Sequence, residues 1–334
     1  MFPTCINLLR YPVFRDITTN KKFIDFKQPV TLEHTDYLEE YSKLNIRFSA
    51  QNSPNFEFLY LTSIPCGICS ECLKKSALEW ATRIQCEARE HEECYFVTYT
   101  YDDEHLPNPP ILDTQIISVI NKRLKSKLRW NNKKSDFRFY GCGEYGSQSA
   151  RPHYHVIYFS LPLDDLRFHS VTEKGDILYT SEFLQSVWPY GFVWIGSVTV
   201  ASSAYVAHYC DKKKVLTSRE KKALLEKGIV PEFARMSRNP GIGSNATEEM
   251  FKKIKNEIRV TLSRGQMVSV PKYYLNRYKK TLSEIELEEF RKKREKKAFI
   301  TISTRLQQAE RSGLDYTTFQ SKLEKRKIVD HRKN

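Results

Sequence analysis

Strand-like and helix-like segments alternate between residues 66 and 214, and this alternation limits the folds open to the chain. The run from Ser70 to His91 contains no Gly or Pro and repeats apolar residues at helical spacing, which predicts an amphipathic helix. Four segments rich in β-branched and aromatic residues predict strands, at 94–101, 137–146, 153–161 and 191–200. No glycine fingerprint of a nucleotide site follows them, which disfavours a parallel nucleotide-binding sheet.

We therefore expect an α+β fold with a central antiparallel sheet of about five strands and its helices on one face. Residues 113–130 predict one flanking helix, and residues 201–214 predict another after small N-capping residues. Residues 1–63 carry no strong period and predict an irregular lead-in. Residues 64–214 form the expected core, and residues 215–334 predict a mostly helical, basic C-terminal region.

The charge balance indicates the kind of partner. The chain of 334 residues has 54 Lys and Arg against 40 Asp and Glu, a formal net charge of +14. Such an excess favours a polyanion over a small acidic substrate. The 19 Tyr, 19 Phe and 4 Trp would also suit a surface that stacks bases, although a large aromatic core explains many of them.

The cysteines and the hydropathy indicate a compartment. Eight cysteines are too few for a disulfide-built scaffold in a chain of this size, which favours a reducing environment. No apolar run is long enough to cross a membrane, and the N-terminus lacks the order of a secretion signal. We expect a cytoplasmic protein without a membrane partner.

Two histidines on one strand are the first candidate site. His153 and His155 lie two residues apart, so both imidazoles project from the same face of the predicted strand. Glu144 ends a neighbouring predicted strand and supplies a carboxylate oxygen. Two imidazoles and one carboxylate with open positions suit a divalent ion such as Mg²⁺ or Mn²⁺ that holds a phosphate.

Two tyrosines on one helix are the second candidate site. Tyr205 and Tyr209 are one helical turn apart and share a face. A phenol has a pKa near 10 and needs a polarised phosphate and positive charge to act as a nucleophile, and Lys212, Lys213 and Lys214 supply that charge. Simple packing of the pair against the sheet is the alternative.

A cysteine cluster is the third candidate site. Cys66, Cys69 and Cys72 precede the helix that carries Cys86, and four thiolates suit a structural Zn²⁺ site. The alternative is reduced thiols at a helix entrance with Cys86 buried on the apolar face.

The order FVTYTYDDEHLP, CGEYGSQSARPHYHVIYF, AYVAHYCDKKK and FARMSRNPGIG resembles the rolling-circle replication initiators of the microviruses, especially the gokushovirus group. These are HUH endonucleases with an RRM-like core. The resemblance covers residues 64–275, and the stretch PCGICSEC fits the same group. It implies that the histidines and Glu144 bind metal, and that the two tyrosines are nucleophiles supported by Lys212 and Lys213. Candidate DNA-binding residues are Arg151, Lys214 and Arg238.

The resemblance also implies a reaction. One tyrosine attacks single-stranded DNA at the viral origin and leaves a 5′-phosphotyrosine and a 3′-OH primer, and the second tyrosine serves the rejoining that releases circles. The expected partners are the origin strand, a host helicase and a DNA polymerase in the host cytoplasm. The sequence contains no G-x4-G-K-[ST] motif, so another protein must separate the strands. A relaxase or transposase of the same chemistry and a non-catalytic single-strand binding protein are the alternatives.

Overall fold

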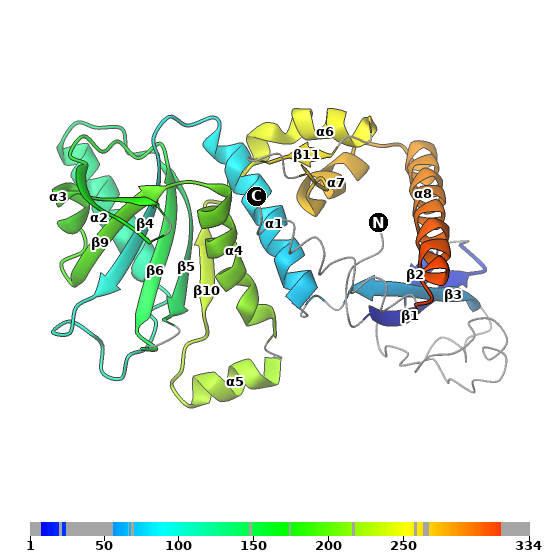
Figure 1. The fold of residues 1–334 in the computed structure, drawn as a ribbon, viewed down its shortest axis with the longest axis horizontal. Helices are drawn as coiled ribbons and strands as arrows, with labels where there is room; N and C mark the ends of the chain where they lie inside the picture. The colour runs from blue at the N-terminus through cyan, green and yellow to red at the C-terminus, as the bar shows by residue number, and fades with distance from the viewer. Residues whose placement is uncertain are drawn as a thin grey trace. The chain divides into compact units, whose positions relative to one another are not determined.

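The structure is a computed structural model. It describes residues 8–19, 22–24, 56–65, 67, 70–146, 149–173, 175–215, 218–256, 259–262 and 267–314, some by backbone alone. The chain divides into two compact units, one of residues 73–284 and one of residues 1–72 with 285–334. Figure 1 labels most of the elements of both units.

A seven-stranded sheet organises the unit of residues 73–284, with strand order β10-β5-β6-β4-β9-β8-β7. All of its pairings are antiparallel. The strands are β4 (Cys94–Tyr101), β5 (Arg138–Tyr145), β6 (Pro152–Phe159), β7 (Arg167–Val171), β8 (Ile177–Thr180), β9 (Gly191–Ser197) and β10 (Phe233–Met236). The expected α+β class with an antiparallel sheet is confirmed, and the β7–β8 hairpin and β10 extend it beyond about five strands.

Helices cover both faces of this sheet, so the expectation of helices on one face is wrong. On one face, α2 (Ile116–Trp130) and α3 (Glu182–Gln185) bury the larger core cluster. On the other, α1 (Ser70–Ala88) and α4 (Val200–Val215) bury a smaller one (Figure 1). The reason lies in β6, where the run of apolar residues 156–159 is buried on both faces. A strand that is apolar on both faces needs a cover on each.

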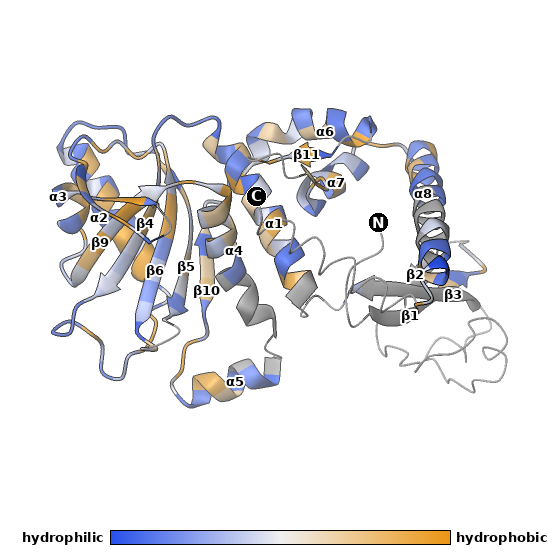
Figure 2. Ribbon diagram, in the orientation of Figure 1, coloured by the Kyte–Doolittle hydropathy of each residue, from blue (hydrophilic) through white to orange (hydrophobic). Residues whose placement is uncertain are grey.

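The hydropathy of the strands fits this layered arrangement. In Figure 2, β9 is largely orange and the loops that connect the strands are largely blue. Val193 and Ile195 of β9 are buried in the cluster under α2, because alternate side chains of a strand point to one face.

The core does not end at residue 214. The strand β10 pairs with β5 from Phe233 to Met236, so a segment beyond the expected boundary completes the sheet. The same unit contains α5 (Ser218–Glu226), α6 (Thr247–Lys255), β11 (Val260–Thr261), β12 (Met267–Val268) and α7 (Lys272–Lys279). The backbone N–H of Gly243 donates to Oε2 of Glu87 at 2.6 Å, and Tyr274 donates to the Gly243 carbonyl at 2.6 Å. The first contact fastens the segment after β10 onto α1, and the second joins that segment to α7.

The N-terminal segment is not irregular in the part that the structure describes. A three-stranded antiparallel sheet is formed by β1 (Leu8–Asp16), β2 (Lys22–Ile24) and β3 (Phe56–Pro65). Its strands escape the sequence pattern because Pro12 interrupts β1. Proline has no backbone N–H to donate to a neighbouring strand. On one side of β1, β2 pairs with residues 13–15 only, and among the described residues no strand lies beside Pro12 on that side. Proline is therefore tolerated there. The same unit contains α8 (Glu284–Arg311).

Candidate active site

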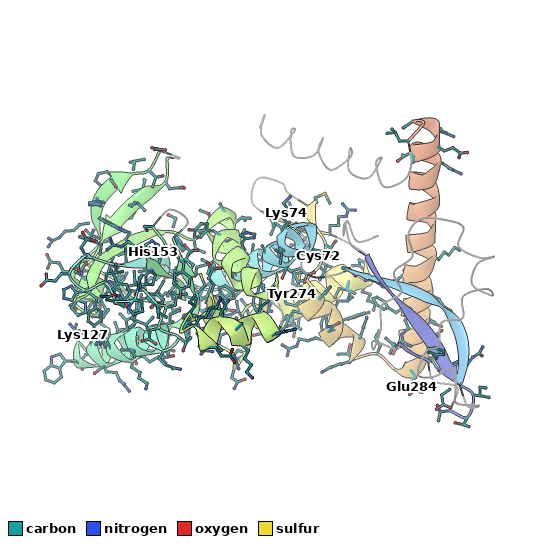
Figure 3. The ribbon with its side chains drawn as sticks, turned by 90° about the horizontal axis from the view of Figure 1, so that it is seen from below. Cys72, Lys74, Lys127, His153, Tyr274 and Glu284 are labelled. Atoms are coloured by element: carbon teal, nitrogen blue, oxygen red, sulfur yellow. The ribbon has the colours of Figure 1, made fainter. Side chains whose placement is uncertain are left out.

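The register of β5 and β6 brings the carboxylate and the two histidines together. Glu144 lies opposite His153, and Cys142 lies opposite His155. Directly paired residues of an antiparallel sheet point to the same face, so the three candidate ligands share one face. It is the face on which α4 packs. Figure 3 shows His153 on the side of the sheet opposite α2, which carries Lys127.

Glu144 is the centre of the hydrogen bonds at this site. Its Oε1 lies 2.7 Å from Nε2 of His155 and accepts a hydrogen bond of 3.0 Å from the hydroxyl of Tyr205. The rings of His155 and Tyr205 meet edge to face, with centroids 5.2 Å apart. Glu144 and His155 are 3% and 6% exposed, whereas Tyr205 is 41% exposed. The phenol of Tyr205 is therefore held on a buried carboxylate while its ring remains open to a ligand.

Two residues of β4 hold the ring of His155, and the sequence reasoning missed both. Thr98 lies opposite His155 in the register, and its Oγ1 is 2.9 Å from Nδ1 of the ring. Phe96 stacks on the same imidazole, with centroids 5.6 Å apart and planes 9° from parallel. A carboxylate oxygen accepts, so Nε2 donates to Glu144 and Nδ1 accepts from Thr98 in the neutral ring. The alternation of side chains along β4 places Phe96 and Thr98 on one face. It identifies them as neighbours of His155 only once the pairing of β4 with β6 is known.

His153 is half-buried, and its environment favours the neutral imidazole. Burial lowers the pKa of His153, and the neighbouring His155 lowers it further, while Glu144 acts in the opposite direction. Nδ1 of His153 and Oε2 of Glu144 are buried without a hydrogen-bond partner among the described residues. Such atoms are rare in folded proteins and call for a ligand or an ion. Neutral imidazole is the form that binds metals.

The donor types fit a divalent ion, but the present arrangement is not that of a formed site. Across the described residues, no group of three or more His, Cys, Asp or Glu side chains is placed to hold a metal. The physical reason is visible in the pair itself. Nε2 of His155 and Oε1 of Glu144 bind each other, so each uses an atom that a shared ion would require. The two buried atoms of His153 and Glu144 named above are the ones available to a ligand.

The helix α4 carries both tyrosines, as the sequence predicts. Tyr205 and Tyr209 lie one turn apart within Val200–Val215, and α4 packs against β5, β6 and β10. Four of the side chains predicted on α4 lie outside the described part of the structure: Tyr209, Lys212, Lys213 and Lys214. Their predicted roles stay predictions.

Arg151 lies directly before β6, and its guanidinium is already engaged. It forms an ion pair of 2.5 Å with Asp103 and donates to the carbonyl of Tyr101 at 3.1 Å. Arg238 is exposed in the segment after β10. Because β10 ends beside Tyr140, four residues along β5 from Glu144, Arg238 is more than roughly 13 Å from that residue along the strand. The structure therefore does not bring Arg238 to the histidine pair.

The cysteines are not arranged as the expected set of four. Cys72 and Cys86 both lie in α1, and roughly 21 Å of helix axis separates them at about 1.5 Å per residue. Cys86 is buried beside Arg89, which donates to its sulfur at 3.4 Å. One zinc ion cannot bind both, so the assignment of Cys86 as a fourth ligand is wrong. Cys66 and Cys69 lie outside the described residues.

Comparison with known proteins defines the class to which this fold and face belong. Residues 94–214, which run from β4 through α4, match the model of a family of replication-associated proteins of the ORF2 type. Replication-associated protein ORF2 of Spiroplasma virus 4 is 33% identical over 275 residues, which are 80% of this chain and 84% of the relative. The chain belongs to this family of replication-associated proteins, and the resemblance found in the sequence is confirmed.

Two further relatives come from phages. Replication-associated protein VP4 of Bdellovibrio phage phiMH2K is 34% identical over 66% of this chain and 69% of its own length. Replication-associated protein ORF4 of Chlamydia phage 1 is 35% identical over 46% of this chain and 39% of its own length. No solved structure matches the chain. Within the described residues, no helix has the length and hydropathy that a membrane crossing requires.

Proposed function

We propose that the protein is a rolling-circle replication initiator that nicks single-stranded viral DNA at its origin by tyrosine transesterification. The observation that carries the proposal is the hydroxyl of Tyr205 on Oε1 of Glu144, beside the ring of His155. A packing tyrosine would be expected to bury its ring, whereas Tyr205 is 41% exposed. The nucleophile is thus held at a carboxylate and remains open to a strand of DNA.

The chain's own residues can balance the reaction. The oxygen of Tyr205 forms a bond to the phosphorus, and the bond from the phosphorus to the 3′ oxygen breaks. The proton of the phenol passes to Oε1 of Glu144, which already accepts it as a hydrogen bond, and Glu144 then returns that proton to the 3′ oxygen, which leaves as a hydroxyl. The products are a 5′-phosphotyrosine and a 3′-OH that primes a polymerase. The phosphate ester keeps the bond energy, so no nucleotide cofactor is consumed.

A divalent ion is part of the proposal. His153, His155 and Glu144 would hold Mg²⁺ or Mn²⁺, which supplies positive charge that polarises the scissile phosphate. The lowered pKa of His153 and the two buried atoms of His153 and Glu144 that lack a partner among the described residues support this assignment. Thr98 and Phe96 fix the ring of His155 in the plane that it needs.

The second tyrosine completes a replication cycle. Tyr209 follows Tyr205 by one turn of α4, so a second phenol is available at the same face once the first is esterified. It cuts the regenerated origin, and the released 3′-OH attacks the first phosphotyrosine and closes the circle. Lys212 and Lys213, on the next turn, supply positive charge to the phosphate. Host helicase and DNA polymerase act as partners in the host cytoplasm.

The test uses the full chain and oligonucleotides that together cover the single-stranded viral genome. Each labelled strand is incubated with Mn²⁺ or with EDTA, separated on a denaturing gel, and any adduct is mapped by mass spectrometry. We expect a metal-dependent adduct at Tyr205 or Tyr209. The double variant Tyr205→Phe with Tyr209→Phe should bind DNA without cutting it. Tyr179→Phe, which removes a hydroxyl from β8, is the control.

The outcome also separates the alternatives. Unchanged cutting by the double variant sinks the assignment of the nucleophiles. Tight binding without an adduct on any strand favours a non-catalytic single-strand binding protein. An adduct that forms only on strands foreign to the viral origin favours a relaxase or a transposase of the same chemistry.

A further inference from the structure

The face of the histidine pair continues across β4 onto β9. Trp194 lies opposite Thr98, which lies opposite His155. Phe192 lies opposite Thr100, which lies opposite His153. Paired residues point to the same face, so both aromatic rings share a face with both imidazoles. Neighbouring strands lie about 4.8 Å apart, which places each ring roughly 10 Å from its histidine.

Three rings gather at this end of the sheet. Phe192 and Trp194 stand two residues apart, with centroids 6.2 Å apart and planes only 14° from parallel. His169 of β7 adds a third ring, 4.2 Å from that of Trp194. We call Phe192, Trp194 and His169 the aromatic row.

The aromatic row is exposed beyond the part of this face that α4 covers. Phe192 is 52% exposed, and Trp194 is half-buried. The helix α4 packs over β5, β6 and β10, on the other side of β4. The same strand buries Val193 and Ile195 on its opposite face. Burying an aromatic side chain is favourable, so parallel rings left in water on a structured sheet mark a contact surface.

We propose that the aromatic row is a stacking platform for the bases of single-stranded DNA, next to the phosphate that is cut. Flat rings in one row stack on any base, and a chain with a net charge of +14 attracts the phosphates. On β4, the small side chains of Thr98 and Thr100 lie between the row and the histidines. A path of about 10 Å spans about three stacked nucleotides at roughly 3.4 Å each. This inference rests on the proposed function, because it places the scissile phosphate at the histidine pair.

A second protein chain is a poorer occupant of the same surface. A stable interface buries about 800 Å² on each partner and has an apolar centre. The aromatic row is three rings wide, and the polar side chains of Thr98 and Thr100 border it on the histidine side. Its size fits two or three bases.

The test measures DNA binding apart from cutting. Fluorescence anisotropy follows the full chain on a labelled oligothymidylate of about 15 nucleotides in EDTA. We expect Phe192→Ala and Trp194→Ala each to weaken binding about tenfold, and the double variant to weaken it by more. Trp194→Phe, which keeps a flat ring, should retain most of the affinity. Thermal unfolding of each variant verifies that the fold is intact.

Phe168→Ala is the matched control. Phe168 is 66% exposed on the same edge of the sheet, but it pairs with Tyr179, which pairs with Ile195 of the opposite face. The Phe168→Ala substitution should therefore leave the affinity for DNA unchanged. Affinity of the double variant within twofold of the unaltered chain overturns the proposal. So does an equal loss in Phe168→Ala, or an unaltered chain that does not bind the oligonucleotide.

The platform and the nicking proposal can fail separately. If the row variants lose binding and the unaltered chain forms no adduct with any viral strand, the platform stands without the nuclease. If the unaltered chain forms the adduct, and the Phe192→Ala, Trp194→Ala double variant binds and cuts DNA as well as the unaltered chain, the nuclease stands without the platform.

Discussion

The hydroxyl of Tyr205 and Nε2 of His155 both bind Oε1 of Glu144, at 3.0 Å and 2.7 Å. One carboxylate oxygen thus joins the candidate nucleophile to a candidate metal ligand. Anything that moves Glu144 must change the position of the phenol and of the imidazole together. This coupling makes Glu144 the most informative residue for mutation.

Glu144→Gln should remove at once the acceptor of the Tyr205 proton and the carboxylate ligand of the metal. The amide has nearly the shape of the carboxylate, but it lacks the negative charge that accepts the proton of Tyr205 and attracts a cation. We expect the yield of DNA adduct to fall at least about a hundredfold, as is typical for the loss of a general base. Binding of Mn²⁺, followed by titration calorimetry, should weaken as well. An adduct yield within threefold of the unaltered chain would contradict the assignment.

Thr98→Val should act on the metal through His155. The substitution keeps the shape of the side chain and removes the hydroxyl that binds Nδ1 at 2.9 Å. Loss of such an outer partner costs about 10- to 100-fold in metal affinity or activity. We expect that loss in Mn²⁺ titrations, while DNA affinity in EDTA stays unchanged. Thr98→Ser retains the hydroxyl and should restore Mn²⁺ binding. Equal affinities for the Val and Ser variants would show that the hydrogen bond has no positioning role.

Gly191→Ala should destabilise the sheet at the start of β9. Gly191 has a φ of 146°, and an added Cβ would collide with the carbonyl of Thr100 and the backbone N–H of Asp102. Backbone cannot move aside as a side chain can. We expect a loss of about 3 kcal/mol or more in the free energy of unfolding, measured by urea denaturation.

Gly196→Ala in the same strand is the control for that measurement. The nearest side-chain atoms to its added Cβ are those of Leu178 and Phe96, both at 3.8 Å, which is ordinary contact. The free energy of unfolding should therefore change far less than in Gly191→Ala. Equal losses in the two variants would refute the argument from φ and collision.

Cys94 should react with alkylating reagents only at high pH. Burial raises the pKa of its thiol from 9.0 to about 11. The thiolate is the reactive form, so the alkylation rate should keep rising with pH towards 11 in the folded chain. In the unfolded chain in urea the rate should level off above pH 9.0, the ordinary value. Mass spectrometry of iodoacetamide adducts measures both profiles.

The raised pKa of Cys94 also makes the stability of the fold depend on pH. The folded pKa lies above the unfolded one, so the contribution of Cys94 to stability is fully present below pH 9.0 and is lost as the pH rises through about 11. Urea denaturation of the unaltered chain should show a decline over that window, and Cys94→Ala should show a smaller one. A midpoint of alkylation near pH 9.0 in the folded chain would refute the shift.

Much of the site was readable along the chain because its signals are local. The period of two on β6 placed His153 and His155 on one face, and the period of α4 placed Tyr205 and Tyr209 one turn apart. Backbone geometry enforces both periods within a few residues. The antiparallel α+β class followed from the order of such segments.

The partners across strands were not readable, because pairing is set by contacts between segments far apart in sequence. Thr98 and Phe96 became supports of His155 only when β4 paired with β6. In the same way β10 joined the sheet from beyond residue 214, and the cysteines of α1 were held apart by the length of one helix.

The sequence by itself determined the class of fold and the strand and helix that carry the histidines and tyrosines. Only the tertiary structure decided that the sheet is covered on both faces and that one oxygen of Glu144 is shared by Tyr205 and His155. The physical reason is that backbone periodicity is fixed within a turn or a strand. Register and packing, in contrast, depend on which distant apolar faces are buried together.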